Sequence, residues 1–330
     1  MESEIPVVDL QGSRAAQVRT FGEAMTNPDL PGFAAFVGHD VSEQAIDMAY
    51  AASRALFAYD FDELMAYYAP ELGGERGYTP PKETSRDEAG GHIQVEVKES
   101  ISFGRRTGEH PGLEAPLRPV MPDALVTLFS DVMMRVFDPT HALFAYQIGL
   151  LEEYFGGSLG ALEHVGPDDG TMMRFLMYPA RARLERDAKR CAWLDARWPD
   201  WRDAAFLSGA HIDSSFLTNL IRATRPGLQF LDRQGRWVMI DISRLPRHAI
   251  VTNAGKCGGR QTGWLMAPRP HRVVRVGDDI DRLSGPCFGW LHPMAPSATA
   301  PVCLERGGRA FEPMPTWKVL QTDLRDYGML

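Results

Sequence analysis

Three residues of this 330-residue chain have the types and spacing to bind a metal ion: His211, Asp213 and His271. Two imidazoles and one carboxylate on one face of an ion leave its other face open, which suits non-haem Fe(II) and chemistry with O2. Side chains alternate along an extended strand, so His211 and Asp213 lie on the same side and can converge on one ion. The pattern also fits an ordinary hydrogen-bonded His–Asp pair with His271 at a strand end. Spacing alone leaves both interpretations open.

A second pair of polar residues, Arg282 and Ser284, follows His271 along the chain. We expect a turn near Asp278 to fold this segment back antiparallel to the strand of His271. Arg282 and Ser284 then share a strand face and point into the same cavity. A guanidinium beside a hydroxyl is a receptor for a carboxylate, because arginine can bind both carboxylate oxygens. The alternative is a surface arginine paired with Asp279 or Asp281.

The N-terminal half shows helical periodicity. We expect a helix after Asp40, with Glu43 completing a capping box, and a long helix from about Pro122 to Tyr154 that Gly156 stops. A basic stretch from Arg181 to Arg190 has interleaved acidic residues and is interpreted as a solvated helix face.

Past residue 170 the chain changes to short runs of β-branched and apolar residues separated by turns. The segment 232–235 is expected to form a hairpin turn. Regular short strands with tight turns favour an antiparallel barrel or jelly roll, with the helices packed on its outside. The expected strands are Met172–Tyr178, Phe216–Ile221, Leu228–Leu231, Trp237–Ile240, Ala249–Thr252, Arg272–Val276 and Pro286–Leu291.

Composition narrows the class of protein. A net charge of −8 and a pI near 5.6 argue against a basic nucleic-acid surface. The four cysteines are scattered without a C-x-x-C pair, which argues against a zinc-thiolate site and fits a reducing, cytoplasmic compartment. The N-terminus lacks signal-peptide features, and no apolar run is long enough to cross a bilayer. We therefore expect neither a nucleic acid nor a membrane as partner.

Several motifs in order along most of the chain resemble those of the Fe(II)/2-oxoglutarate-dependent oxygenases, in the branch similar to isopenicillin N synthase. Individually several are weak, but their shared order and spacing are specific. Two positions depart from the usual pattern: Leu176 stands in place of an asparagine, and Asn219 in place of an apolar residue. The motifs are IPVVDL (5–10), GFAAFVGHDV (32–41), RGYTP (76–80), MRFLMYP (173–179), GAHIDSSFLTNLI (209–221), HRVV (271–274) with RLS (282–284), and FGWLHP (288–293).

The resemblance implies a double-stranded β-helix, a jelly-roll or cupin-like core, with N-terminal helices packed outside. We expect one oxygenase domain over 1–330: a mostly helical region (1–165), the β-helix core (166–295) and a C-terminal extension with a helix (296–330). It further implies that His211, Asp213 and His271 bind Fe(II). Arg282 and Ser284, with help from the Tyr178 hydroxyl, would hold the distal carboxylate of 2-oxoglutarate.

The function implied is oxidation of a C–H bond of a small-molecule metabolite, by hydroxylation, desaturation or ring closure. Decarboxylation of 2-oxoglutarate to succinate and CO2 with O2 would be coupled to it. Two alternatives stay open: an Fe(II) oxidase that uses no 2-oxoglutarate, of the isopenicillin N synthase or ACC oxidase type, and a non-catalytic ligand-binding relative. The substrate, the outcome of the reaction and the oligomeric state cannot be read from the sequence.

Overall fold

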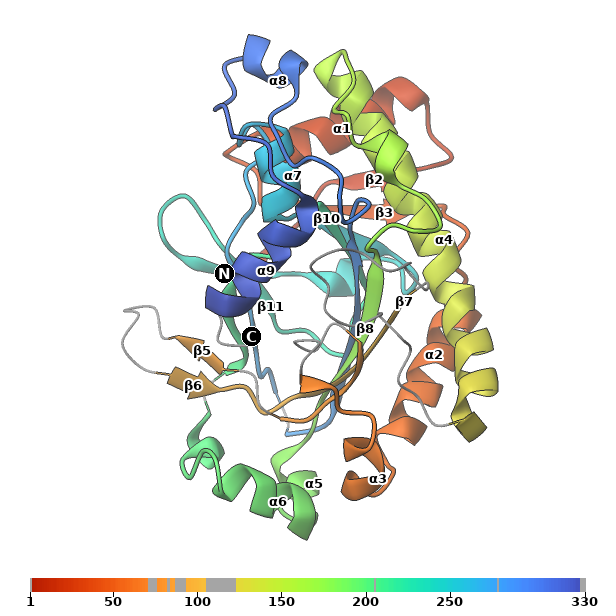
Figure 1. The fold of residues 1–330 in the computed structure, drawn as a ribbon, viewed down its shortest axis with the longest axis vertical. Helices are drawn as coiled ribbons and strands as arrows, with labels where there is room; N and C mark the ends of the chain where they lie inside the picture. Colours follow the sequence, from red (N-terminus) through yellow and green to blue (C-terminus); the bar gives the residue numbers. More distant parts are fainter. Residues whose placement is uncertain are drawn as a thin grey trace.

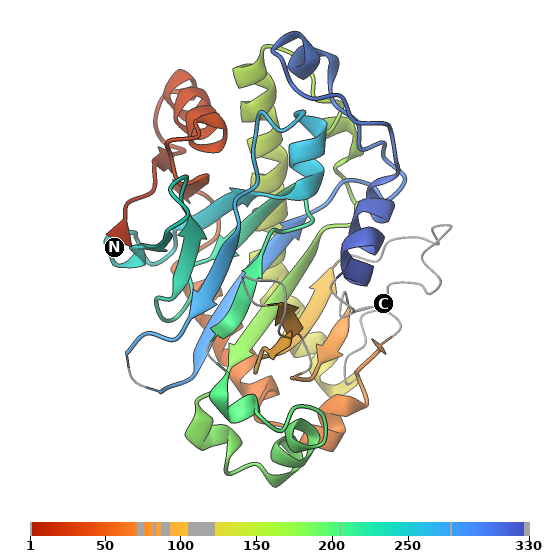
Figure 2. The ribbon, with the colours of Figure 1, turned by 90° about the vertical axis from the view of Figure 1, so that its left-hand side faces the viewer.

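Two β-sheets form the centre of the protein (Figures 1 and 2). The structure is a computed structural model, and it describes residues 2–70, 76–81, 84–86, 93–104, 123–204, 206–277 and 279–326. One sheet has five strands in the order β1 (Glu2–Ser3), β12 (Trp237–Ile240), β11 (Leu228–Leu231), β14 (His271–Val274) and β9 (Phe206–His211). The other has eight, in the order β2 (Val7–Asp9), β3 (Phe33–Val37), β13 (Ile250–Ala254), β10 (Leu217–Ile221), β15 (Arg282–Gly289), β8 (Met172–Tyr178), β7 (Glu99–Gly104) and β4 (Gly77–Thr79). A separate pair joins β5 (Thr84–Arg86) to β6 (Ile93–Val95).

Strand β8 shows why the eight-stranded sheet is apolar on both faces. All seven of its residues are buried. Because side chains alternate along a strand, Met173, Phe175 and Met177 face one side and join the core beneath the helices. Leu176 and Tyr178 face the other side and pack with residues of the five-stranded sheet, such as Phe230. The space between the sheets is therefore a second core, and the functional cavity opens within it. This arrangement is the predicted double-stranded β-helix.

The long helices cover the outer face of the eight-stranded sheet (Figures 1 and 2). Helix α4 contacts β10 and β15 as well as α1 and α2, and its bounds agree with the predicted long helix. Helix α2 begins two residues later than the predicted capping box implies: Ser42, not Asp40, caps it by accepting a hydrogen bond from the Ala45 amide. The helices are α1 (Arg14–Thr26), α2 (Glu43–Leu56), α3 (Phe61–Met65), α4 (Asp123–Phe155), α5 (Arg181–Leu184), α6 (Ala188–Asp195), α7 (Lys256–Gln261), α8 (Pro301–Glu305) and α9 (Thr316–Asp326), with short 3-10 turns at Leu162–His164, Trp201–Asp203 and Ile242–Arg244.

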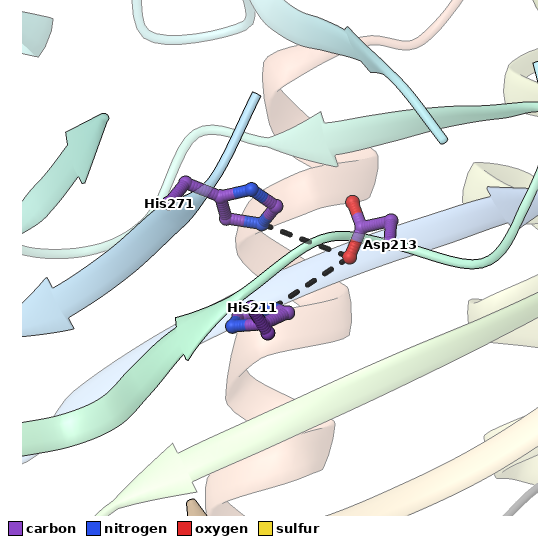
Figure 3. A group of neighbouring side chains, drawn as sticks. All are labelled: His211, Asp213 and His271. Atoms are coloured by element: carbon purple, nitrogen blue, oxygen red, sulfur yellow. Dashed lines mark ion pairs between the residues drawn. The ribbon is translucent and has the colours of Figure 1, made fainter. Parts of the chain in front are cut away.

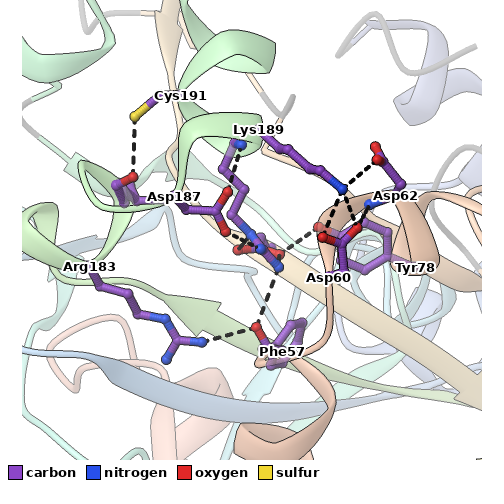
Figure 4. Close-up of polar contacts among 11 residues, drawn as sticks. Phe57, Asp60, Asp62, Tyr78, Arg183, Asp187, Lys189 and Cys191 are labelled. Atoms are coloured by element: carbon purple, nitrogen blue, oxygen red, sulfur yellow. Dashed lines mark hydrogen bonds and ion pairs between the residues drawn. The ribbon is translucent and has the colours of Figure 1, made fainter.

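The basic stretch at α5 and α6 is only partly a solvated face. Lys189 is exposed, as expected, and it pairs with Asp60 (Figure 4). Arg190, in contrast, is buried. Arg190 Nε donates to Glu99 Oε1 at 2.9 Å, and Nη1 donates to Asp187 Oδ2 at 2.5 Å. The interpretation of Arg190 as a surface residue is therefore wrong, because a carboxylate on β7 compensates its charge inside the protein.

The strands that carry the two predicted polar clusters lie in different sheets. Strand β14 pairs with β9 and β11, whereas β15 pairs with β8 and β10. The expectation that the segment after His271 folds back antiparallel onto the strand of His271 is wrong, since the chain crosses from one sheet to the other. Position 278, where the turn was expected, lies outside the described residues. Arg282 therefore lies in the eight-stranded sheet, whereas His211 and His271 lie in the five-stranded sheet.

Most of the predicted strands are confirmed, and three of them, now β8, β11 and β12, have the predicted bounds. The strand predicted from Pro286 is longer and begins at Arg282. The hairpin turn at Asp232 is also confirmed, with the Asp232 amide donating to the Arg236 carbonyl at 2.9 Å. No helix among the described residues combines the length and apolar character needed to cross a bilayer.

Candidate metal and cosubstrate site

His211 and His271 face each other across two paired strands. His211 ends β9, His271 begins β14, and the two are register partners with ring centroids 4.4 Å apart. The Nδ1 atom of His211 lies 2.8 Å from the Gly209 carbonyl, and that of His271 lies 3.1 Å from the Arg269 carbonyl. A carbonyl only accepts, so each Nδ1 carries the proton and donates it. This tautomer leaves the Nε2 lone pair of both rings available to a metal.

Asp213 completes the group from the loop that follows β9. Its Oδ1 atom lies 3.6 Å from Nε2 of His211 and 3.6 Å from Nε2 of His271 (Figure 3). The three ligand atoms all lie within 4.8 Å of one another, a spacing that a single ion can bridge. Strand β9 ends at His211, so Asp213 is reached by a loop and not by the extended strand that the sequence predicted.

Neighbouring side chains fix which oxygen of Asp213 faces the histidines. Asn253 on β13 donates from Nδ2 to Asp213 Oδ2 at 2.8 Å, and Thr218 on β10 also hydrogen-bonds this carboxylate. Oδ1 is therefore the oxygen directed at the two Nε2 atoms. The sequence analysis did not identify Asn253 or Thr218, because nothing in the local pattern links either residue to Asp213.

The electrostatics of the group suit a cation. Burial acts to raise the pKa of Asp213, but the two histidines and the hydrogen bonds from Thr218 and Asn253 outweigh it and hold the pKa below its ordinary value. Burial lowers the pKa of His271, against the opposing effect of Asp213. At neutral pH the carboxylate is thus ionised and the imidazole of His271 is neutral. These are the protonation states that metal ligands need.

Arg282 and Ser284 line the same cavity from the opposite sheet. On β15, Arg282 lies opposite Tyr178 and Ser284 lies opposite Leu176 of β8. Arg282 is buried, with its Cζ 5.0 Å from the centroid of the Tyr178 ring and its Nε donating to the Arg225 carbonyl at 3.2 Å. Its Nη1 is buried and has no hydrogen-bond partner.

A buried guanidinium nitrogen without an acceptor is costly unless a ligand supplies one. The surface alternative for Arg282 is wrong, because Asp281 pairs with Arg183 and Asp279 pairs with Arg275. The donor set fits a carboxylate such as the distal one of 2-oxoglutarate: a free Nη1, the Ser284 hydroxyl nearby, and an aromatic ring that orients the guanidinium.

The rest of the cavity wall is mixed in character. Phe288 and Trp290 are aromatic, whereas Lys98 and Glu96 form a buried ion pair with Nζ and Oε2 2.5 Å apart. Arg174 also lines the cavity and donates from Nε to Ser102 at 2.9 Å. The tryptophans at 193, 198 and 201 are not among the residues that line this cavity. They lie in or against a separate apolar cluster with Leu184 and Leu194.

Comparisons with known proteins agree with this fold. Residues 5–122 match the profile of the family described as "non-haem dioxygenase in morphine synthesis N-terminal". A curated relative, the 2-oxoglutarate-Fe(II) type oxidoreductase ppzC of Metarhizium rileyi, is 24% identical over 315 residues, which are 87% of this chain and 78% of the relative.

Two solved structures share the fold over nearly the whole chain. One is a 2OG-Fe(II) oxygenase family protein from Caulobacter crescentus, with a TM-score of 0.75, 22% identity, and 98% of both chains covered. The other is a full-length protein of Neurospora crassa in complex with alpha-KG, with a TM-score of 0.73, 20% identity, and 98% of this chain and 96% of that chain covered. A further structure of the Neurospora crassa protein holds alpha-KG and thymine.

Two facing groups of side chains, His211, Asp213 and His271 on one side and Arg282 with Ser284 on the other, fit the metal and cosubstrate sites expected of a non-haem iron oxygenase. The profile match over residues 5–122 and the curated relative make this chain similar to the Fe(II)/2-oxoglutarate-dependent oxygenases, and the two solved structures show that it shares their fold.

Proposed function

We propose that this protein oxidises a C–H bond of a small-molecule metabolite, with Fe(II) held by His211, Asp213 and His271. Arg282, Ser284 and Tyr178 bind the distal carboxylate of 2-oxoglutarate. The observation that carries the proposal is the pairing of two features in one cavity: three ligand atoms within 4.8 Å of one another, and a buried Arg282 Nη1 without an acceptor. A non-catalytic binding module has no need of an open metal face.

Iron held at this site would supply, with 2-oxoglutarate and O2, the oxidation of a substrate C–H bond, coupled to the release of succinate and CO2. The chain's own residues prepare this chemistry. The Nδ1–H groups of the histidines, held by backbone carbonyls, keep both Nε2 atoms directed inward. Asn253 holds Asp213 in its ligating orientation. Arg282 neutralises the carboxylate at the far end of the cosubstrate and fixes its position.

The lining of the cavity supports a small-molecule substrate. It lies between the two sheets, and its wall combines apolar side chains with a few polar ones, as is usual for small-ligand sites. The complex of the Neurospora crassa protein with thymine is a precedent for such a substrate on this fold. The reaction then gives hydroxylation, or gives desaturation or ring closure if the same oxidised carbon reacts differently.

The test is O2 consumption and succinate release by the Fe(II)-loaded protein, with and without 2-oxoglutarate and in the presence of candidate metabolites. We expect O2 consumption to require 2-oxoglutarate and Asp213→Ala to abolish it. Arg282→Ala should raise the KM for 2-oxoglutarate by about 30-fold or more, because a buried charge partner is removed. Arg236→Ala, a change on the exposed hairpin turn, is the control.

Two outcomes would contradict the proposal. O2 consumption that proceeds without 2-oxoglutarate would identify an oxidase in which Arg282 and Ser284 hold a carboxylate of the substrate. A protein that binds no iron and consumes no O2 would be a ligand-binding relative without catalysis.

A further inference from the structure

Helix α9 forms one wall of the cavity that contains the metal ligands. Leu320, Asp323 and Leu324 line this cavity together with His211 and Asp213. Figure 1 shows the helix in front of the barrel, close to α7, and the two helices are in contact. The C-terminal helix is thus part of the site, although it is the last element along the chain.

The inward face of α9 follows a helical stripe with one unexpected member. Thr316, Val319, Leu320, Asp323 and Leu324 recur at spacings of three and four, so they share one face. Val319 and Leu324 are buried and apolar, but Asp323, also buried, carries a charge. A buried carboxylate is unfavourable unless charged or hydrogen-bonding groups compensate it. The partners of Asp323 therefore indicate what the residue does.

Both partners of Asp323 belong to the surroundings of the metal ligands. Ser214, the residue after Asp213, donates a hydrogen bond from its hydroxyl to Asp323 Oδ2. Lys256 at the start of α7 lies with Nζ 2.7 Å from Asp323 Oδ1. The Lys256 backbone amide in turn donates to the Asp213 carbonyl at 2.7 Å. One carboxylate on α9 thus holds the metal-binding loop twice, directly through Ser214 and indirectly through Lys256.

The other end of α9 is anchored independently. The Thr316 hydroxyl donates to the carbonyls of His292 at 2.8 Å and Pro293 at 3.0 Å, and Thr316 is fully buried. These carbonyls follow Trp290, which lines the cavity. With its first turn fixed by Thr316 and its last turn fixed by Asp323, the helix holds Leu320 and Leu324 against the cavity.

We propose that Asp323 is a positioning residue that holds the loop carrying Asp213 and locks α9 in place, so that Leu320 and Leu324 shield the metal site from bulk water. Water near the metal competes with the substrate and weakens the electrostatic interactions within the site. This inference rests on the proposed function for the identity of the metal site. The contacts that fix α9 do not depend on it.

The test measures water access to the bound metal rather than turnover. The probe is Mn(II) bound to the full-length protein with 2-oxoglutarate present, and the readout is the longitudinal relaxation rate of water protons. We expect Asp323→Ala to raise this rate above that of the unchanged protein. Leu324→Ala removes most of an apolar side chain that lines the cavity and keeps the ion pair between Asp323 and Lys256. This variant should raise the relaxation rate too. Arg325→Ala, on the exposed face of the same helix, is the matched control and should leave it unchanged.

A second measurement tests how firmly the loop that carries Asp213 is held in place. Capture of Co(II) from the loaded protein by an excess of chelator should be about three- to tenfold faster in Asp323→Ala. Residues that contact a metal ligand directly have larger effects on metal binding. We expect a smaller effect here because Asp323 contacts Ser214, the neighbour of the ligand Asp213. Ser214→Ala removes only the hydrogen bond to the loop and keeps α9 paired with Lys256. It should give a smaller acceleration in the same direction, and it tests the inference if Asp323→Ala does not fold.

The outcomes are distinguishable. Unchanged proton relaxation and unchanged Co(II) capture in both Asp323→Ala and Ser214→Ala would overturn the inference and leave the proposed function intact. If the unchanged protein binds neither Mn(II) nor Co(II), the proposed function fails. The hold on the loop is then judged by hydrogen exchange of residues 209–216, which Asp323→Ala must accelerate and Arg325→Ala must not.

Discussion

At the scale of single residues, the most informative substitution is at Asn253, whose side chain holds Asp213, one of the proposed metal ligands. Asn253 donates to the oxygen of Asp213 that faces away from the histidines, at 2.8 Å. In Asn253→Ala, Asp213 loses this hydrogen bond and its orientation is no longer fixed. Partners behind metal ligands typically contribute about 10–100-fold to metal affinity. We expect Co(II) affinity to fall by about tenfold or more, measured by anaerobic titration of the Co(II) absorption bands.

Asn219 provides the matched control on the adjacent strand. It is as buried as Asn253, but its amide bonds to Gln147 of α4 and its Oδ1 accepts from Thr252 at 2.6 Å. Asn219→Ala removes the donor to Gln147 Oε1 and the acceptor of the Thr252 hydroxyl, although Gln147 still donates to Thr252, and it should cost about 1–3 kcal/mol in the free energy of unfolding. Co(II) affinity should stay unchanged. Equal loss of affinity in both variants would mean that displacement of the sheet, and not the orientation of Asp213, controls metal binding.

The sequence predicted some of these residues and could not predict others. His211, Asp213, His271, Arg282 and Ser284 lie in short motifs whose residue types already suggest ligands, and the structure places them around one cavity. Asn253 and Asp323 lie in segments with no such pattern. Their roles depend on hydrogen bonds to Asp213 and Ser214, which are distant in the chain, and only the folded arrangement creates those contacts.

At the scale of elements, Asp187 joins the start of α6 to the buried Arg190. Its side chain caps the helix by accepting from the Arg190 amide at 3.0 Å, and it also pairs with the guanidinium. Burial acts to raise the pKa of Asp187, but the bonds from Arg190 outweigh it and hold the pKa below its ordinary value. The ionised form is therefore the one that stabilises the fold, and its contribution is lost as pH falls through the lowered pKa.

Asp187→Asn tests this ion pair and keeps a side chain that can cap the helix. At pH 7 we expect the variant to be about 0.5–1 kcal/mol less stable in urea unfolding. The difference should shrink as pH falls below about 4, the unfolded value, and through the lowered pKa of Asp187. A difference that persists undiminished at the lowest pH would show that the loss comes from the cap and not from the charge.

The strands show how much of the fold can be predicted from the sequence. Strands β8, β11 and β12 were predicted with their bounds because apolar runs between turn residues mark them locally. Strands β3, β4 and β7 were not predicted, and β3 joins the sheet by pairing with β13 from the other half of the chain. The placement of β14 and β15 in different sheets was missed for the same reason. A strand's partner is decided by long-range packing, which a local pattern does not encode.

At the scale of the whole molecule, the proposed ligands connect the two sheets. His211 and His271 belong to strands of the five-stranded sheet, whereas Arg282 and Ser284 belong to the eight-stranded sheet. A metal alone would be held by His211 and His271 of the five-stranded sheet and by Asp213 of the loop that follows β9. A 2-oxoglutarate molecule held by both the metal and Arg282 would span the space between the sheets.

Thermal unfolding can separate these two contributions. A ligand that binds only the folded state stabilises it by about 2.7 kcal/mol at one hundred times its dissociation constant. We expect Co(II) to raise the Tm and 2-oxoglutarate to raise it further only when Co(II) is present. In Arg282→Ala the Co(II) increment should remain, and the 2-oxoglutarate increment should fall to about a third or less at the same concentration, because binding is about 30-fold weaker or more. Arg282→Lys should recover part of it, since lysine keeps the charge but not the two-point contact. A full 2-oxoglutarate increment in Arg282→Ala would place the distal carboxylate elsewhere in the cavity.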